Sequence, residues 1–533
     1  MSWTRTSAFA LAATLLVSLP FEAQAQVCDE SNTQSALQYL RRLSLDLRGH
    51  LPSVDELNSV VTNDEIDPAI IRSMLQSEDA VTQLRAYHRD LLWTNVVDQR
   101  LSNQSWQLRL GDRAYGGGRD VYWLNGRGRR YRGVQNMPCL DEPARFDPTT
   151  NAILTTTDQA TGATREGWVE VSPYWAPNTT VKVCAFDAQT ATEVPQGNRM
   201  VSCESNANNT ACGCGPNLQY CQNGAATGRV ITAAFNEQLL RYADDIVRSD
   251  RPYTDLIVGK DMEVNGPISH YFRYQSFNGQ NQLLSSEQQG YTMPELEFND
   301  STTWQKVDRG QRHSGVLTMP AYFIKFQTDR GRANRFYNAF LCQHFEAPAG
   351  GLPAAADSCH EEPDLTKRCG CAYCHASLEP AAAYWGRWSE AGLIPLAEAA
   401  YPERDMECTG PNAQRIGRCR RFYLTRAGHP DEEPYVGMLL PYVFADDARK
   451  EAITAGPESI ARQAIDNGAF ARCTATKMWS RYMHRAPADD EADVIAELAS
   501  GFSADNYNLR NLIERIVKRP EYAAAGRFSA DKE

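Results

Sequence analysis

Three cysteines and a histidine are crowded into one short stretch of the chain, KRCGCAYCHASLEP at residues 367–380. Two residues separate Cys371 from Cys374, and His375 follows directly. This spacing is the C-x-x-C-H signature of c-type haem attachment. Each thiol can add to one of the two haem vinyl groups, and the adjacent histidine is then carried beneath the iron as its proximal axial ligand. The pattern predicts one covalent haem c on Cys371, Cys374 and His375.

Two other chemistries fit the same stretch. A structural zinc site could use Cys369 together with Cys371, Cys374 and His375, although such sites usually combine two separated ligand pairs. The second pair would come from Cys342 with His344 or from Cys359 with His360. Plain disulfides need no metal, but they leave the histidine without a role.

A haem also needs an apolar wall and usually a sixth iron ligand. Tyr384, Trp385 and Trp388 follow the motif and are candidates for the wall, with ordinary core packing as the alternative. Met438 is the first candidate for the sixth ligand, because it lies in a turn bounded by glycine and proline. The other candidates are Met406, Met478, Met483, His429 and His484.

The N-terminus has the features of a cleaved signal peptide at residues 1–25. Arg5 precedes the apolar run AFALAATLLVSL, and AQA, ending at Ala25, is a small-residue cleavage site. The run is too short to cross a bilayer, and Val27 is not the small residue that precedes a lipidated cysteine. No later stretch is long and apolar enough to span a membrane. We therefore expect an exported, soluble protein in the periplasm, or secreted or at the cell surface.

Export decides how the 15 cysteines are interpreted, because thiols in an oxidising compartment mostly form disulfides. Four of them lie close together in a loop-rich segment: Cys203, Cys212, Cys214 and Cys221. We expect these four to staple that segment by disulfides. Their pairing stays open, and Cys139 or Cys184 could join them.

The elements that position these residues are expected to be mainly helical. The leucines at 40, 43, 47 and 51 have helical spacing, and Ser53 with Glu56 forms a capping box for the next helix. Apolar residues at 235–247 and 509–517 follow the same period, and Pro520 ends the second run. Valines at 169, 171, 181 and 183 alternate with polar residues, which is typical of strands. The apolar segment at 315–326 could be helix or buried strand.

The chain, at 533 residues, is too long for a single core. We predict a mainly α, multi-domain protein with a small cysteine-rich β insert and a c-type cytochrome-like haem-binding segment. The predicted parts are a signal peptide (1–25), an N-terminal helical domain (26–130), the insert (131–228), a second helical domain (229–345), the haem-binding segment (346–425) and a C-terminal helical domain (426–533).

Several stretches resemble the planctomycete-type cytochrome c domain proteins with their associated domains of unknown function, which are also abundant in myxobacteria. RRLSLDLRGHLPSVDEL is similar to the family's N-terminal motif, and CAYCHASLEP to its C-x-x-C-H-x-x-[IL]-[DE]-P core. RPYTDLIVGKDMEVNGPISHYF, HSGVLTMPAYFIKFQTDRG and FARCTATKMWSRYMHR resemble further blocks. The resemblance implies an exported protein with one c-type haem on Cys371, Cys374 and His375, but no established reaction. The alanines after Pro380, where the family often has Leu-Gly, depart from the pattern.

Three functions fit these observations. The favoured one is electron transfer by an exported mono-haem protein with an unidentified redox partner protein. A haem-dependent oxidoreductase, peroxidase-like or oxygenase-like, with an open iron site is the first alternative, and a surface binding or assembly protein with a disulfide-stapled insert is the second. No signature of another cofactor and no catalytic triad is visible. The net charge of -12 argues against nucleic acids and anionic membranes as partners.

Overall fold

The computed structural model of the protein describes residues 34–63, 65–97, 101, 104–111, 118–124, 131–134, 137–204, 206, 209–276, 291–345, 358–390, 392–393 and 395–524. The predicted signal peptide, Cys28 and the linker at 346–357 lie outside these residues. About half of the described part is helical, and it also has several small sheets and six disulfides. None of its helices is both long and apolar enough to cross a membrane.

Four helices open the described chain: α1 (Ala36–Arg48), α2 (Val54–Asn63), α3 (Pro68–Gln76) and α4 (Glu78–Leu92). The predicted helical leucines at 40, 43 and 47 are buried on α1, whereas Leu51 lies beyond the helix and is exposed. Gly49 ends α1 in the left-handed region at φ 80°, which glycine adopts without a steric penalty. The predicted capping box at Ser53 and Glu56 is confirmed by its two reciprocal hydrogen bonds.

A five-stranded sheet forms the centre of the cysteine-rich part. Its strands, in spatial order, are β11 (Gln222–Asn223), β1 (Gln107–Leu110), β2 (Val121–Leu124), β8 (Val181–Cys184) and β7 (Trp168–Val171). The predicted valine strands are β7 and β8, which pair antiparallel and align Val169 with Val183. Strands β1 and β2 precede residue 131, the predicted start of the insert, and belong to the same sheet.

Small hairpins surround this sheet: β3 (Arg145–Phe146) with β4 (Ile153–Leu154), β5 (Thr156–Thr157) with β6 (Thr164–Arg165), and β9 (Glu193–Gln196) with β10 (Arg199–Ser202). The four cysteines expected to staple this part form two disulfides, Cys203–Cys212 and Cys214–Cys221. Cys139 and Cys184 pair with each other instead of joining them. Short strands and short-range disulfides replace the large core that this part lacks.

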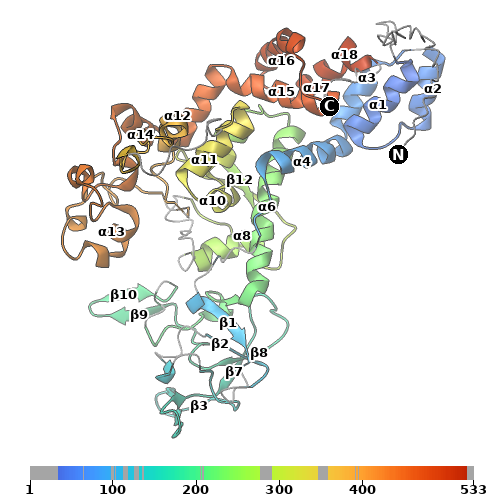
Figure 1. The fold of residues 1–533 in the computed structure, drawn as a ribbon. Helices are drawn as coiled ribbons and strands as arrows, with labels where there is room; N and C mark the ends of the chain where they lie inside the picture. Colours follow the sequence, from blue (N-terminus) through green and yellow to red (C-terminus); the bar gives the residue numbers. More distant parts are fainter. Residues whose placement is uncertain are drawn as a thin grey trace, which may run out of the picture.

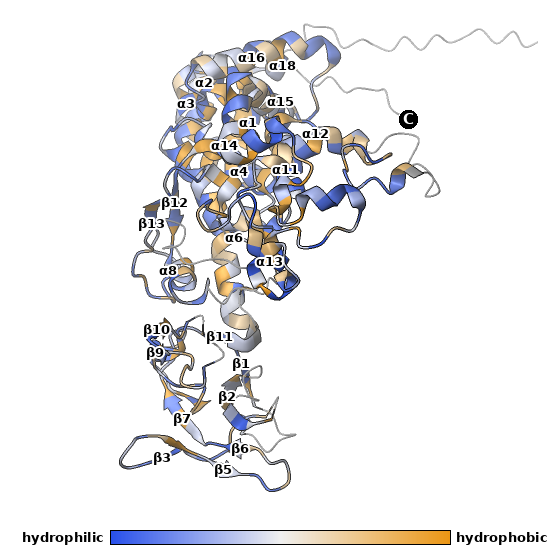
Figure 2. Cartoon of the chain, turned by 90° about the vertical axis from the view of Figure 1, so that its left-hand side faces the viewer, coloured by the Kyte–Doolittle hydropathy of each residue, from blue (hydrophilic) through white to orange (hydrophobic). Residues whose placement is uncertain are grey.

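The helix α6 (Gly224–Arg248) leads from the cysteine-rich part into the helical part of the molecule, and the sheets of the cysteine-rich part lie together near the N-terminal end of α6 (Figures 1 and 2). The predicted apolar face of α6 is buried. Shorter elements follow: α7 (Asp255–Val258), β12 (Asp261–Val264), α8 (Gly266–His270), β13 (Gln305–Asp308), α10 (Pro320–Lys325) and α11 (Asp329–Phe336). The apolar segment at 315, left open between helix and strand, is helical.

The remaining helices are α12 (Ala372–Ala383), α13 (Gly417–Phe422), α14 (Asp447–Asp466), α15 (Ala469–Met483), α16 (Ala492–Ala504), α17 (Leu509–Val517) and α18 (Pro520–Ala523). The predicted apolar run at 509–517 is α17, and all five of its apolar residues are buried. The last helices return to the first ones (Figure 1), where the Tyr39 hydroxyl donates to the Val517 carbonyl. Helix α12, which carries the C-x-x-C-H stretch, packs against α11 and α14.

Candidate functional site

The C-x-x-C-H stretch forms the first turn of α12. Cys371 is the N-cap residue, and its carbonyl accepts hydrogen bonds from the amides of Cys374 (3.2 Å) and His375 (2.9 Å). Both cysteine side chains are half-buried. The helical turn therefore holds the two sulfurs and the imidazole on neighbouring positions of one rigid element.

The disulfides of the protein leave Cys371 and Cys374 as thiols. Six disulfides use twelve cysteines; with these two and Cys28, which lies outside the described residues, all 15 are accounted for. Cys369 pairs with Cys359, and Cys342 pairs with Cys473. The zinc interpretation needed Cys369 and either Cys342 or Cys359 as ligands. Because these cysteines are in disulfides, their sulfurs cannot bind zinc as thiolates.

One face of α12 continues from the motif into the protein interior. Cys371, His375, Glu379 and Ala383 are spaced four residues apart, so they follow one another along the same side of the helix. Glu379 and Ala383 are buried, whereas His375 is half-buried. The motif therefore lies at the outer end of a face whose inner end is enclosed.

The His375 ring is held by a buried carboxylate. Its Nδ1 atom lies 2.6 Å from the Oε1 atom of Glu379, whose side chain is only 8% exposed. Arg330 donates to both carboxylate oxygens, and Arg449 lies 3.5 Å from Oε2. Burial alone would raise the pKa of Glu379, but the hydrogen bonds of Arg330 and His375 and the charges of Arg330 and Arg449 outweigh it and lower that pKa.

The ionised carboxylate of Glu379 determines which tautomer the His375 imidazole adopts. An ionised carboxylate only accepts hydrogen bonds, so Nδ1 of His375 carries the proton and donates to Glu379. The other ring nitrogen, Nε2, is then the atom that can bind a metal ion. Metal-binding histidines usually have such a carboxylate partner, which orients the ring and raises its basicity.

A cavity of about 350 Å³ lies beside the buried half of α12. Glu379 and Ala383 belong to its wall, together with the apolar residues Trp388, Leu396 and Phe422. The wall also includes three guanidinium groups, those of Arg330, Arg421 and Arg449. Five carboxylates line it as well, those of Asp329, Asp364, Glu379, Glu390 and Glu432, whereas Cys371, Cys374 and His375 do not. The cavity is therefore strongly charged, and its arginines are the groups that could pair with the carboxylates of an organic cofactor.

The three aromatic residues predicted as a pocket wall lie in different surroundings. Trp388 is buried and contributes to the wall of this cavity. Trp385 is fully buried in the main core, where its Nε1 donates to the Leu317 carbonyl. Tyr384 is half-buried and is hydrogen-bonded to Gln463. Neither Tyr384 nor Trp385 lines the cavity.

Met438, the first candidate for a sixth ligand, is half-buried in the loop before Leu440. Its backbone carbonyl accepts from the Leu424 amide, and its side chain packs on the cluster around the Cys408–Cys419 disulfide. Leu440 and Leu424 line the cavity, but Met438 does not. The identity of the sixth ligand stays a prediction.

The other candidates for that ligand have local roles. Met478 is fully buried in the main core, Met483 packs against that core, and Met406 is 71% exposed. His429 accepts from the Asp431 amide as the cap of a short helix, and His484 lies 3.2 Å from Asp46.

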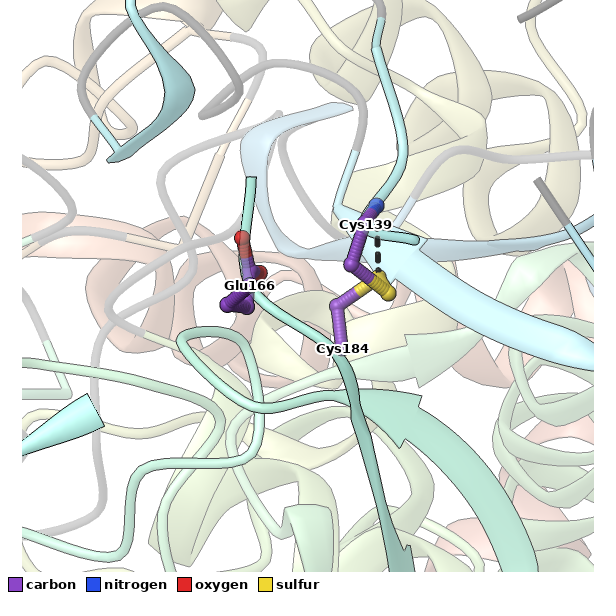
Figure 3. Close-up of side chains that lie close together, drawn as sticks. All are labelled: Cys139, Glu166 and Cys184. Atoms are coloured by element: carbon purple, nitrogen blue, oxygen red, sulfur yellow. Dashed lines mark hydrogen bonds between the residues drawn. A yellow bond between two sulfur atoms is a disulfide. The ribbon is translucent and has the colours of Figure 1, made fainter. Parts of the chain in front are cut away.

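Compact groups of metal-binding side chains occur at two other places in the described residues, and both contain a disulfide. Figure 3 shows the first, where Glu166 lies beside the Cys139–Cys184 bridge. The second combines Asp405 with the Cys408–Cys419 bridge. Disulfide sulfurs lack the thiolate charge that binds metal ions, so neither group is a candidate metal centre.

Sequence reasoning did not single out the residues that hold His375. Glu379 follows the histidine at the helical spacing of four, which was a usable signal. Arg330 and Arg449 lie on other helices, and nothing in their sequence surroundings marks them as partners of α12.

Comparison of the chain with protein families, curated proteins and solved structures finds no match.

Proposed function

We propose that this protein is an exported mono-haem c-type cytochrome-like protein that transfers electrons. One observation carries the proposal: two thiols and a histidine share the first turn of α12, while twelve other cysteines are bridged. A helix that bears two thiols among so many disulfides is best explained if they react with something other than each other. The resemblance to planctomycete-type cytochrome c domain proteins supports the same class.

The residues around α12 have the chemistry that such a haem requires. Cys371 and Cys374 would form the two thioether bonds, and Nε2 of His375 would bind the iron. Glu379 holds the imidazole with the correct nitrogen protonated. Arg421 lines the cavity, and its guanidinium is suited to a haem propionate. When bound, the group supplies an iron that takes up and releases one electron.

A haem-dependent oxidoreductase with an open iron site is the second candidate, and two observations favour it. The Met438 side chain packs on the cluster around the Cys408–Cys419 disulfide. The carboxylate on Nδ1 of His375 makes the imidazole a stronger donor, which stabilises oxidised iron. Both features oppose the high potential that a methionine ligand gives to an electron carrier.

Export is part of the proposal. Disulfides persist in oxidising compartments, and six bridges support a location in the periplasm or outside the cell. c-Type haem is also attached outside the cytoplasm.

The test is the absorption spectrum of protein matured with c-type haem machinery, recorded oxidised and reduced. We expect a c-type spectrum that is lost when Cys371 and Cys374 are both replaced by alanine. The matched control replaces Cys214 and Cys221, which also removes two cysteines but should leave the spectrum intact. Absence of haem from the wild-type protein, or equal loss in both variants, would contradict the proposal. A far-red band in the oxidised protein marks histidine–methionine ligation, and its absence would favour the open-site enzyme.

A further inference from the structure

A second cavity, of about 820 Å³, is lined by neither Cys371 nor Cys374. Its wall comes from α1, from α4, from α11 with the π-helical turn that follows it (Tyr337–Leu341), and from α15. It shares no lining residue with the cavity beside α12. Any ligand of this second cavity would therefore have its own binding site.

Three cationic side chains line this cavity: Arg335, Lys477 and Arg481. Lys477 and Arg481 are four residues apart on α15, so they lie on the same face of that helix. Arg335 approaches from α11, where it is the basic residue of the last turn. The cavity therefore has cationic side chains from two different helices.

Neutral groups hold the two arginines in place. Arg335 donates to the carbonyls of Asp90 and Leu91 at the end of α4, and its guanidinium lies 4.5 Å from the centre of the Trp93 ring. Arg481 donates to the Gln83 carbonyl at 2.8 Å. The Nε atoms of both arginines are buried and donate to no acceptor in the described part of the chain.

Carboxylates do not neutralise these cations. Within the described residues, none of the three side chains is within ion-pair distance of an acidic group. Asp46 and Asp90 also line the cavity. The Asp46 carboxylate is already occupied by Arg42, His484 and the Tyr522 hydroxyl, and Asp90 is exposed and faces Arg335 with its backbone carbonyl.

The surroundings of Lys477 and Arg335 disfavour their positive charge. Burial lowers the pKa of Lys477, and the nearby charge of Arg335 lowers it further. Burial likewise lowers the pKa of Arg335. A bound anion would relieve this repulsion and would replace the solvent that the side chains have lost.

We propose that this cavity binds a phosphate group, either as inorganic phosphate or at the end of a phosphomonoester. Guanidinium groups match the oxygens of phosphate with paired N–H donors, and a lysine adds a compact point charge. The amide of Asn338 lines the same cavity and has one N–H beyond the one that it donates to Asn334, so it adds a neutral donor. The hydroxyls of Thr476 and Ser480 also line the cavity, but they donate to the backbone carbonyls of Arg472 and Thr476. Three cations in one cavity suit a dianion better than a single carboxylate.

The experiment is isothermal titration calorimetry of the full-length mature protein with inorganic phosphate, at an ionic strength held constant with chloride. We expect saturable binding at one site, and we expect Arg335→Gln and Lys477→Gln each to weaken it by about tenfold or more. The matched control is Arg472→Gln, which removes an exposed cation of the same helix outside the cavity. This control should bind phosphate like the wild-type protein. Lys477→Arg keeps the charge and should keep most of the binding, which separates charge from folding.

Two further ligands identify the chemistry. Glycerol phosphate that binds as well as inorganic phosphate would show that the site accepts the group on a monoester, whereas much weaker binding would restrict it to the free ion. Both results support the proposal. Absence of saturable binding by both phosphates, tighter binding of succinate than of either, or equal weakening in Arg472→Gln would overturn it.

Discussion

The replacement Glu379→Gln tests whether the carboxylate beneath His375 tunes the proposed iron. Glutamine keeps the shape of the side chain and can still accept a hydrogen bond, but it removes the negative charge. In the native protein this charge lies on an 8% exposed side chain, and the bond to Nδ1 of His375 measures 2.6 Å. The perturbation therefore changes the electrostatics of the axial ligand more than its position.

The expected size follows from the strength of that bond. A hydrogen bond to an ionised acceptor is roughly twice as strong as a neutral one, which corresponds to a difference of about 1 kcal/mol. Arg330 and Arg449 neutralise part of the carboxylate, so we take a range of about 0.7–1.4 kcal/mol. For transfer of one electron this range corresponds to about 30–60 mV. The charge stabilises oxidised iron, so its removal should raise the reduction potential.

Spectroelectrochemical titration of the haem-loaded protein measures this potential. Glu390→Gln is the matched control, because Glu390 lines the same cavity but its carboxylate accepts from the Asp329 amide. We expect the control to shift the potential much less. An unchanged or lower potential in Glu379→Gln, or an equal rise in both variants, would refute the reasoning.

Two further predictions concern stability. Burial lowers the pKa of His88 and of His270 from 6.5 to about 3, so the unfolded chain takes up protons first. The free energy of unfolding is therefore highest above pH 6.5 and falls as the pH is lowered towards 3. At pH 5 the loss should be about 2 kcal/mol per histidine. Equal urea midpoints at pH 7 and pH 5 would contradict this. Replacing Cys342 and Cys473 by serine opens a loop of 131 residues and should lower the free energy of unfolding by about 5 kcal/mol. Loss of the Cys214 disulfide, with a separation of 7 residues, should cost about half as much in the same urea assay, and a larger cost would refute the loop-length argument.

Local periodicity predicted the helices well. The apolar residues of α6 and α17 repeat at the helical period because one side of each helix is buried. Strands β7 and β8 were predictable because their valines alternate with polar residues. Strand β2 (Val121–Leu124) was missed, since three of its four residues are buried and no alternation appears.

Long-range partners could not be predicted from the sequence. The spacing of the cysteines does not reveal that Cys342 pairs with Cys473, because many pairings are compatible with one sequence. Arg330 is 49 residues from Glu379, and only the packing of α11 on α12 brings them together. The motif itself was visible because Cys371, Cys374 and His375 lie within one helical turn.

The mass of the denatured protein is the most direct test of the central claim, which is covalent attachment of haem to Cys371 and Cys374. The protein should be matured with c-type haem machinery, extracted with acid acetone and analysed by mass spectrometry under denaturing conditions. We predict that it retains the mass of one haem and that a peptide containing residues 371–375 carries it. Release of the haem into the acid acetone, or a protein mass without haem after successful maturation of a known cytochrome c in the same cells, would contradict the claim.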